Sequence, residues 1–123
     1  MAENSNIEWT DHTDNLWFGT SISNPETIKY GGVLQRQDVK NRFLSIEPQI
    51  GRISHQDMGG LLHSIDWVIQ GGESGPKRRP FNIEWAYEMK ELCEDYSVPY
   101  FFKQIDKVQP IPEDLLIKQF PLK

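Results

Sequence analysis

The sequence predicts an α/β fold, a partial (β/α) barrel of about four mainly parallel strands with flanking helices. Two observations predict it. Short continuous apolar runs end at Gly or Pro residues, which is typical of strands that are covered on both faces. Segments with helical character separate these runs at intervals of about 25 residues, so consecutive strands are expected to be joined by right-handed crossovers.

Four apolar runs are predicted to be strands: residues 16–22, 42–46, 65–70 and 99–104. The first run stops before Pro25, the second before Pro48 and the third before Gly71-Gly72. Because these residues interrupt regular pairing, they set the expected carboxyl ends of the strands.

Three segments are predicted to be helical: residues 25–37, 56–63 and 82–96. Asn24 is the expected N-cap of the first helix, with Pro25 in its first position. The pair Gly31-Gly32 lowers the helix propensity of that segment. Asn82 is the expected N-cap of the third segment, whose apolar residues recur at helical spacing.

The composition indicates a single α/β domain over residues 1–123, with an N-terminal segment at 1–14 and a Pro-rich C-terminal tail at 105–123. A hydrophobic fraction of 37% and a charged fraction of 25% exclude a disordered tail, a collagen-like repeat and a disulfide scaffold. The chain carries 13 basic and 18 acidic residues, a net charge of −5, which argues against direct nucleic-acid binding.

The cellular location predicted from the sequence is the cytoplasm, with no membrane association. No apolar run reaches the roughly 18 residues that a membrane-spanning helix needs, and the first residues lack the pattern of a secretory signal. Cys93 is the single cysteine, which fits a reducing compartment and excludes a site built from several thiolates.

Five blocks of the sequence carry a family resemblance: residues 6–13 (NIEWTDHT), 15–21 (NLWFGTS), 42–48 (RFLSIEP), 66–75 (DWVIQGGESG) and 99–104 (PYFFKQ). In this order they resemble a phage-associated family of three-Cys-motif, radical SAM-like proteins. In that family the first block runs on into the cysteines of an iron–sulfur cluster and then into further βα units. Here Thr13 is followed directly by Asp14 and then by the second block, so those cysteines and about half of the family's barrel are absent. A cluster needs about three or four thiolates, so Cys93 alone cannot hold one.

The candidate ligand site is a glycine-rich loop after the third predicted strand, formed by Gly71, Gly72, Glu73, Ser74 and Gly75. Loops at this end of an open parallel sheet commonly bind ligands, and the basic residues 77–79 follow. The resemblance implies that the loop is part of a site for S-adenosylmethionine, which is the one cofactor considered. The alternative is a glycine turn beside a solvated basic cluster.

Ser45 and Glu47, at the end of the second predicted strand, complete this candidate site as remnants of ligand contacts on its rim. In the alternative interpretation, Glu47 and Glu73 form ion pairs that hold loops together, with Arg42, Arg78 or Arg79 as partners. The three histidines are too scattered for a metal site, and Cys93 is expected to be a buried small hydrophobe. No catalytic residue and no metal ligand is assigned.

The favoured function is a non-catalytic interaction protein of phage or mobile-element origin, such as an anti-CRISPR-like inhibitor of a host defence protein. The alternatives are a small-molecule binder of the S-adenosylmethionine class and one subunit of a split radical SAM enzyme. A protein partner is therefore expected. Because half a barrel leaves two open sheet edges, either the terminal segments cover them or two copies join edge to edge into one pseudo-barrel.

Overall fold

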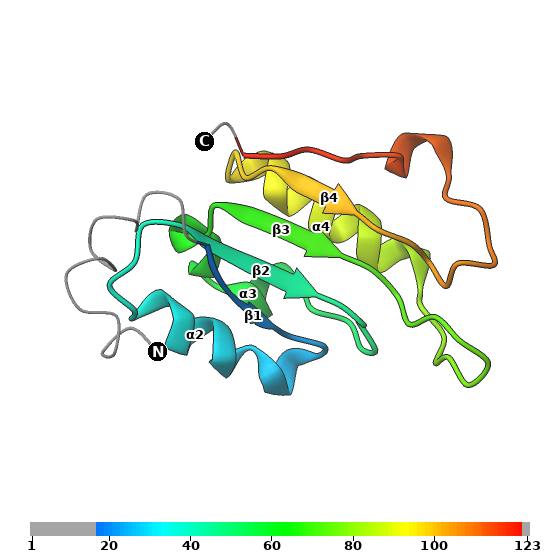
Figure 1. Cartoon of the computed structure of the whole chain (residues 1–123), viewed down its shortest axis with the longest axis horizontal. Helices are drawn as coiled ribbons and strands as arrows, with labels where there is room; N and C mark the ends of the chain where they lie inside the picture. Colours follow the sequence, from blue (N-terminus) through cyan, green and yellow to red (C-terminus); the bar gives the residue numbers. More distant parts are fainter. Residues whose placement is uncertain (1–16, 122–123) are drawn as a thin grey trace.

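The computed structural model describes residues 17–121, and it contains one parallel sheet of four strands (Figure 1). The strands are β1 (Phe18–Ser21), β2 (Arg42–Ile46), β3 (Trp67–Gln70) and β4 (Tyr100–Phe102). Their order in the sheet follows their order in the chain, and each neighbouring pair is parallel. The predicted α/β fold is confirmed, and each predicted strand contains one observed strand. The N-terminal segment predicted at residues 1–14 lies outside the described residues.

The connections contain the α-helices α2 (Lys29–Gln35), α3 (His55–Met58) and α4 (Ile83–Asp95) and the 3₁₀ helices η3 (Pro25–Thr27) and η4 (Leu61–Ser64). A further 3₁₀ helix, η5 (Glu113–Leu115), lies in the tail after β4. The helix predicted at residues 25–37 is thus divided into η3 and α2, and the one at 56–63 into α3 and η4. The third prediction, residues 82–96, agrees closely with α4.

Local capping explains where two of these helices begin. The Asn24 side chain accepts a hydrogen bond from the Thr27 amide at 3.1 Å, and the Thr27 hydroxyl accepts one from the Asn24 amide at 3.2 Å. This reciprocal pair satisfies two amides that a helix start leaves unpaired. Asn82 accepts from the Glu84 amide at 3.0 Å and caps α4. Both predicted N-caps are confirmed, although Asn24 caps the short 3₁₀ helix rather than α2.

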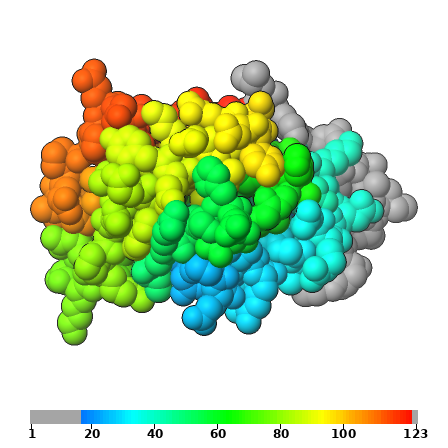
Figure 2. Space-filling model, turned by 180° about the vertical axis from the view of Figure 1, so that it is seen from behind, coloured from blue at the N-terminus to red at the C-terminus, as the bar shows by residue number. Residues whose placement is uncertain are grey.

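All three α-helices cover the same face of the sheet. When consecutive parallel strands are neighbours, right-handed crossovers place every connecting helix on one side. Figure 1 shows α3 and α4 behind the strands, and Figure 2, seen from behind, shows the helical segments covering that side. Within residues 17–121 the strands are therefore covered by helices on one face only, which differs from the cover on both faces that the continuous apolar runs predicted.

The core lies between the sheet and its helices. Alternate strand residues face this layer, and the largest buried apolar side chains among them are Leu44, Ile46, Val68, Tyr100 and Phe102. A polar network crosses the same layer: the Gln70 amide donates to Gln49 Oε1 at 2.6 Å, and the Tyr100 hydroxyl donates to Gln70 Oε1. Because these buried polar atoms satisfy one another, Gln70 can occupy an interior position.

The C-terminal tail runs along the outer edge of β4 in the opposite direction (Figure 1). Phe102 N donates to Ile117 O at 2.9 Å, and Gln119 N donates to Tyr100 O at 3.0 Å. The Gln119 side chain accepts from Tyr100 N at 3.0 Å. Of the outcomes predicted for the sheet edges, cover by the Pro-rich tail is the one found at β4.

Candidate functional site

The glycine-rich loop begins as a continuation of the sheet. Gly71 and Gly72 are buried, and Gly71 N donates to Ile46 O at 3.1 Å while Gly72 N donates to Gln104 O at 2.9 Å. Gln49 N in turn donates to Gly71 O at 3.0 Å. The first two glycines of the motif are therefore held between the segments that leave β2 and β4.

Chain packing explains why position 72 is a glycine. A Cβ atom placed there would lie 2.0 Å from Ile105 O and 2.9 Å from the Cβ of Phe81. The backbone after β4 thus occupies the space that a side chain would need. Gly75 is required for another reason, because its φ of +106° lies in a region that residues with a side chain rarely adopt.

The exposed part of the loop is closed by a bidentate ion pair. The Arg79 guanidinium donates to both Glu73 carboxylate oxygens, at 2.8 and 2.9 Å, and the Arg79 amide donates to Glu73 Oε1 at 2.9 Å. The hydrogen bonds from Arg79 lower the pKa of Glu73 to about 2. The ion-pair interpretation of Glu73 is confirmed, while Ser74 is exposed on the same loop.

A second ion pair anchors the loop to the chain after β4. Arg78 Nε lies 3.1 Å from Asp106 Oδ2. Asp106 also accepts hydrogen bonds from the amides of Gln109 and Val108, at 2.8 and 2.9 Å. These bonds, led by the one from the Gln109 backbone, hold the pKa of Asp106 well below its usual range. The basic residues after the motif are thus partly used in fastening the loop.

Glu47 joins the carboxyl ends of three strands. Its carboxylate lies 3.3 Å from Lys103 Nζ and accepts from Gln104 Nε2 at 2.9 Å. The same Gln104 amide donates to Gly72 O at 2.6 Å. The predicted arginine partner for Glu47 is therefore wrong, because the segment directly after β4 places a lysine and a glutamine beside its carboxylate. Gln104 Oε1 is buried and accepts no hydrogen bond within the described residues.

Ser45 lies on the other face of the sheet from the helices, between Ser21 on β1 and Ile69 on β3. It alternates with Leu44 and Ile46, which face the core. The structure thus brings Glu47, Gly72 and Gln104 together, but it places Ser45 with the residues of the uncovered face.

The uncovered face carries an aromatic cluster that the sequence interpretation did not identify as a site. We call it the open aromatic face; its members are Trp17, Phe43, Trp67, Phe101 and Phe120. Trp67 is at its centre, with ring centroids 6.2 Å from Trp17, 6.3 Å from Phe43 and Phe101, and 5.6 Å from Phe120. The Trp67 indole also donates to Gln119 O at 2.9 Å, which fixes the tail against the sheet.

The side chains of this face remain accessible. Phe120 is 62% exposed, and the rings on β2, β3 and β4 are half-buried. Lys118, directly opposite Phe101 in the antiparallel bridge, places its Nζ 5.7 Å from the centre of that ring. A period-two spacing of large apolar residues in each strand is the signal that could have identified the face.

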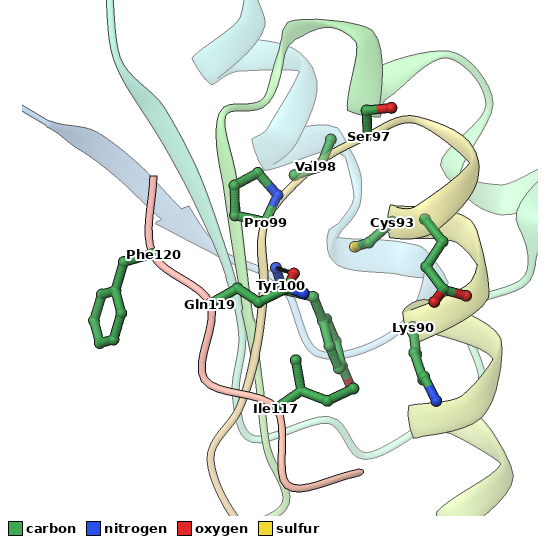
Figure 3. Close-up of a pocket in the computed structure, with 10 residues that line it drawn as sticks. Lys90, Cys93, Ser97, Val98, Pro99, Tyr100, Ile117, Gln119 and Phe120 are labelled. Atoms are coloured by element: carbon green, nitrogen blue, oxygen red, sulfur yellow. Dashed lines mark hydrogen bonds between the residues drawn. The ribbon is translucent and has the colours of Figure 1, made fainter. Parts of the chain in front are cut away.

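A groove of about 450 Å³ lies between α4 and the C-terminal tail, and Phe120 lines it as well as belonging to the open aromatic face (Figure 3). Cys93 from α4, Tyr100 from β4 and Ile117 from the tail lie around it, with Lys90 and Glu94 on the helix side. Burial raises the pKa of the Cys93 thiol to about 12, so the neutral thiol dominates near pH 7. Cys93 is buried, as predicted, and lacks the character of a reactive cysteine.

The described chain shows no group of three His, Cys, Asp or Glu side chains placed to hold a metal ion. His63 instead packs against the Tyr96 ring, with centroids 4.7 Å apart. None of the helices in residues 17–121 is long and apolar enough to span a bilayer.

A family model described as "Protein of unknown function (DUF5131)" matches residues 1–114. No curated protein and no solved structure matches the chain.

Proposed function

We propose that this chain, which belongs to the DUF5131 family of proteins of unknown function, is a non-catalytic interaction protein that binds another protein through its open aromatic face. The main support for this proposal is the aromatic cluster around Trp67, on a sheet face that no helix in residues 17–121 covers. Contiguous exposed apolar patches commonly mark interaction sites, and aromatic residues contribute most to binding at protein interfaces.

The side chains beside the cluster define the chemistry of the partner. Lys118 is exposed and lies opposite Phe101 in the bridge between the tail and β4. Its ammonium group favours a partner surface that presents apolar side chains with carboxylates around them. In this proposal a host defence protein, the target class predicted for a phage-derived inhibitor, is one such partner.

The partners and the pKa values of the titratable side chains support a role without catalysis. Glu47 is engaged by Lys103 and Gln104, and Arg79 lowers the pKa of Glu73 to about 2. General acids and bases work best with a pKa near the operating pH, which the Glu73 carboxyl does not have. Burial likewise keeps the Cys93 thiol protonated near neutral pH.

The test compares two substitutions on the same tail. Phe120→Glu introduces a charge into the open aromatic face, whereas Leu116→Glu introduces the same charge at a residue with nearly the same exposure, 62% against 60%. Tagged full-length chains are used to recover partner proteins from cells that contain the gene, with quantitative mass spectrometry as the readout.

A partner that uses this face is recovered with the wild type and with Leu116→Glu, and its recovery falls at least about 10-fold with Phe120→Glu, a loss of roughly 1.4 kcal/mol. The interaction is then repeated with the two purified proteins by calorimetry. Equal recovery with both substitutions, or no partner that purified protein binds directly, would overturn the proposal.

A further inference from the structure

The outer edge of β1 presents backbone groups that no described residue pairs. Ile22 N donates to Ser45 O at 2.9 Å, so Ile22 faces β2. The direction of the backbone groups alternates along a strand, and Gly19 and Ser21 therefore face away from β2. Both residues are exposed, and β1 has one neighbour in the sheet of residues 17–121.

The opposite edge of the sheet is closed by the chain itself. Phe102 N donates to Ile117 O, and Gln119 N donates to Tyr100 O, so the tail occupies the hydrogen-bonding positions of β4. Closing a pseudo-barrel from two half-barrels would require this tail to leave β4. A strand that joins the sheet at β1 displaces no described residue, whereas one that joins at β4 displaces the tail.

An apolar flank of α2 lies beside the same edge. Tyr30 and Val33 are each 47% exposed, although both are large and apolar. At 100° per residue, they lie on the side of α2 roughly opposite Gln35, whose amide donates to Ser64 Oγ at 2.9 Å and so faces η4. Leu34, between these directions, is buried. Because α2 packs mainly on β1 and its Gln35 side faces η4, we expect the opposite flank to lie toward the outer edge of β1; Figure 1 shows α2 beside that strand.

We infer that the β1 edge and the Tyr30–Val33 flank together bind a second copy of this chain through an antiparallel β1–β1 pair. With a two-fold axis at Thr20, Gly19 lies opposite Ser21 of the partner subunit. Each such pair exchanges two backbone hydrogen bonds, which gives four across the axis. The same rotation places the apolar flank of α2 beside its own copy.

Self-complementarity favours a second copy over an unrelated strand. The outward residues are symmetric about Thr20, and the flanking helix supplies apolar surface to both sides of the axis. Neither Gly19 nor Ser21 is one of the lysines or prolines that commonly protect edge strands from pairing. Since the tail closes the other edge, pairing at β1 ends with two copies and does not extend into a fibre.

The proposed interface is small. Strands of four residues bury too little surface on their own, because stable interfaces bury about 1,200 Å² or more in total. The α2 flank must contribute, and the expected dimer is a weak one with a dissociation constant in the range of about 1–100 μM. This interface uses the backbone edge of β1, whereas the open aromatic face uses rings; the two surfaces adjoin at Gly19, over which Phe43 packs.

Sedimentation velocity of the full chain over about 2–500 μM tests the inference, since the range brackets the expected constant. The mass is expected to rise from 14.3 kDa toward twice that value. Ser21→Pro removes an outward amide while keeping a backbone shape that proline tolerates at an edge. Val33→Lys places like charges next to each other across the axis. Each is expected to weaken association at least about 10-fold, or roughly 1.4 kcal/mol.

The matched control is Val108→Lys, the same substitution at a residue that is 69% exposed in the loop after Asp106. It should associate as the wild type does. Circular dichroism establishes that each variant keeps its fold. A monomer at every concentration, or a dimer that both Ser21→Pro and Val33→Lys leave intact, overturns the inference. A dimer that Phe120→Glu dissociates would also overturn it, because the open aromatic face would then be the contact.

Discussion

Gly72 and the carbonyl of Ile105 approach so closely that a Cβ on residue 72 would lie 2.0 Å from the oxygen. The carbonyl belongs to the backbone after β4, where Gly72 N also donates to Gln104 O. To relieve this clash, the loop at residue 72 and the backbone at Ile105 would have to move apart. The motif that the sequence associates with a ligand therefore has a packing function of its own.

Replacing Gly72 with alanine is expected to lower the free energy of unfolding by about 2–3 kcal/mol, because the backbone it meets cannot rotate away as a side chain would. Urea denaturation of the purified chain, without any ligand, is the measurement. Gly32→Ala is the control: its Cβ would meet only the end of Arg36, at 3.7 Å, in the interior of α2. That substitution should stabilise the protein by about 0.5–1 kcal/mol. A Gly72→Ala variant as stable as the wild type would show that the loop has room.

The Glu73–Arg79 ion pair predicts a specific dependence on pH. Arg79 lowers the pKa of Glu73 from 4.5 to about 2, so its contribution to stability is present above pH 4.5 and is lost as the pH falls toward 2. In Arg79→Ala the pKa should return toward 4.5, as measured by the carboxyl carbon shift of Glu73 in NMR titration. Lys77→Ala removes a neighbouring cation that makes no bond to Glu73 and should leave the titration unchanged. An ordinary pKa for Glu73 in the wild type would rule out the bidentate geometry in solution.

Cys93 is expected to react slowly while the protein is folded. Burial raises its pKa to about 12, which leaves little thiolate at pH 8, and the side chain is 1% exposed. Alkylation by iodoacetamide, followed by mass spectrometry, should be at least about 100-fold slower in the folded chain than in urea. Because the chain has a single cysteine, every modified molecule reports on this position. Equal rates in the two conditions would place the thiol at the surface.

Titration with S-adenosylmethionine addresses the alternative function. Chain segments already occupy the space beside Gly72, and Arg79 already engages Glu73, so we expect neither saturable heat nor a change in melting temperature. A ligand at 100 times its dissociation constant would stabilise the fold by about 2.7 kcal/mol, which shifts the midpoint by several degrees. A shift that disappears in Lys77→Ala would instead support a small-molecule site at this loop.

The sequence was most informative where local chemistry decides the structure. The run RFLSI at 42–46 is bounded by Pro48 and is rich in residues that favour strands, and the observed β2 has the same limits. Asn24 and Asn82 were recognisable as caps because capping depends on residues within a few positions of each other. These features require no knowledge of the remainder of the chain.

Features that depend on distant segments could not be predicted in this way. Glu47 receives its partners from Lys103 and Gln104, which are more than fifty positions further along the chain, and nothing near Glu47 indicates a lysine rather than an arginine. The aromatic residues of β2 and β3 fit a strand with either one or two covered faces. Whether one face or both faces are covered depends on the handedness of the connections and on the number of strands. A single apolar run gives no information about either.

The pairing between β4 and residues 117–119 also determines when the edge of β4 becomes covered during synthesis of the chain. A ribosome releases β4 before it releases the segment that covers β4, so the nascent chain passes through a stage in which both outer strands carry unpaired amides and carbonyls. Such exposed strands are where growing chains on neighbouring ribosomes can associate. Once residues 117–119 have been synthesised and have paired with β4, one of the two strand edges at which an incomplete copy can associate with another is covered.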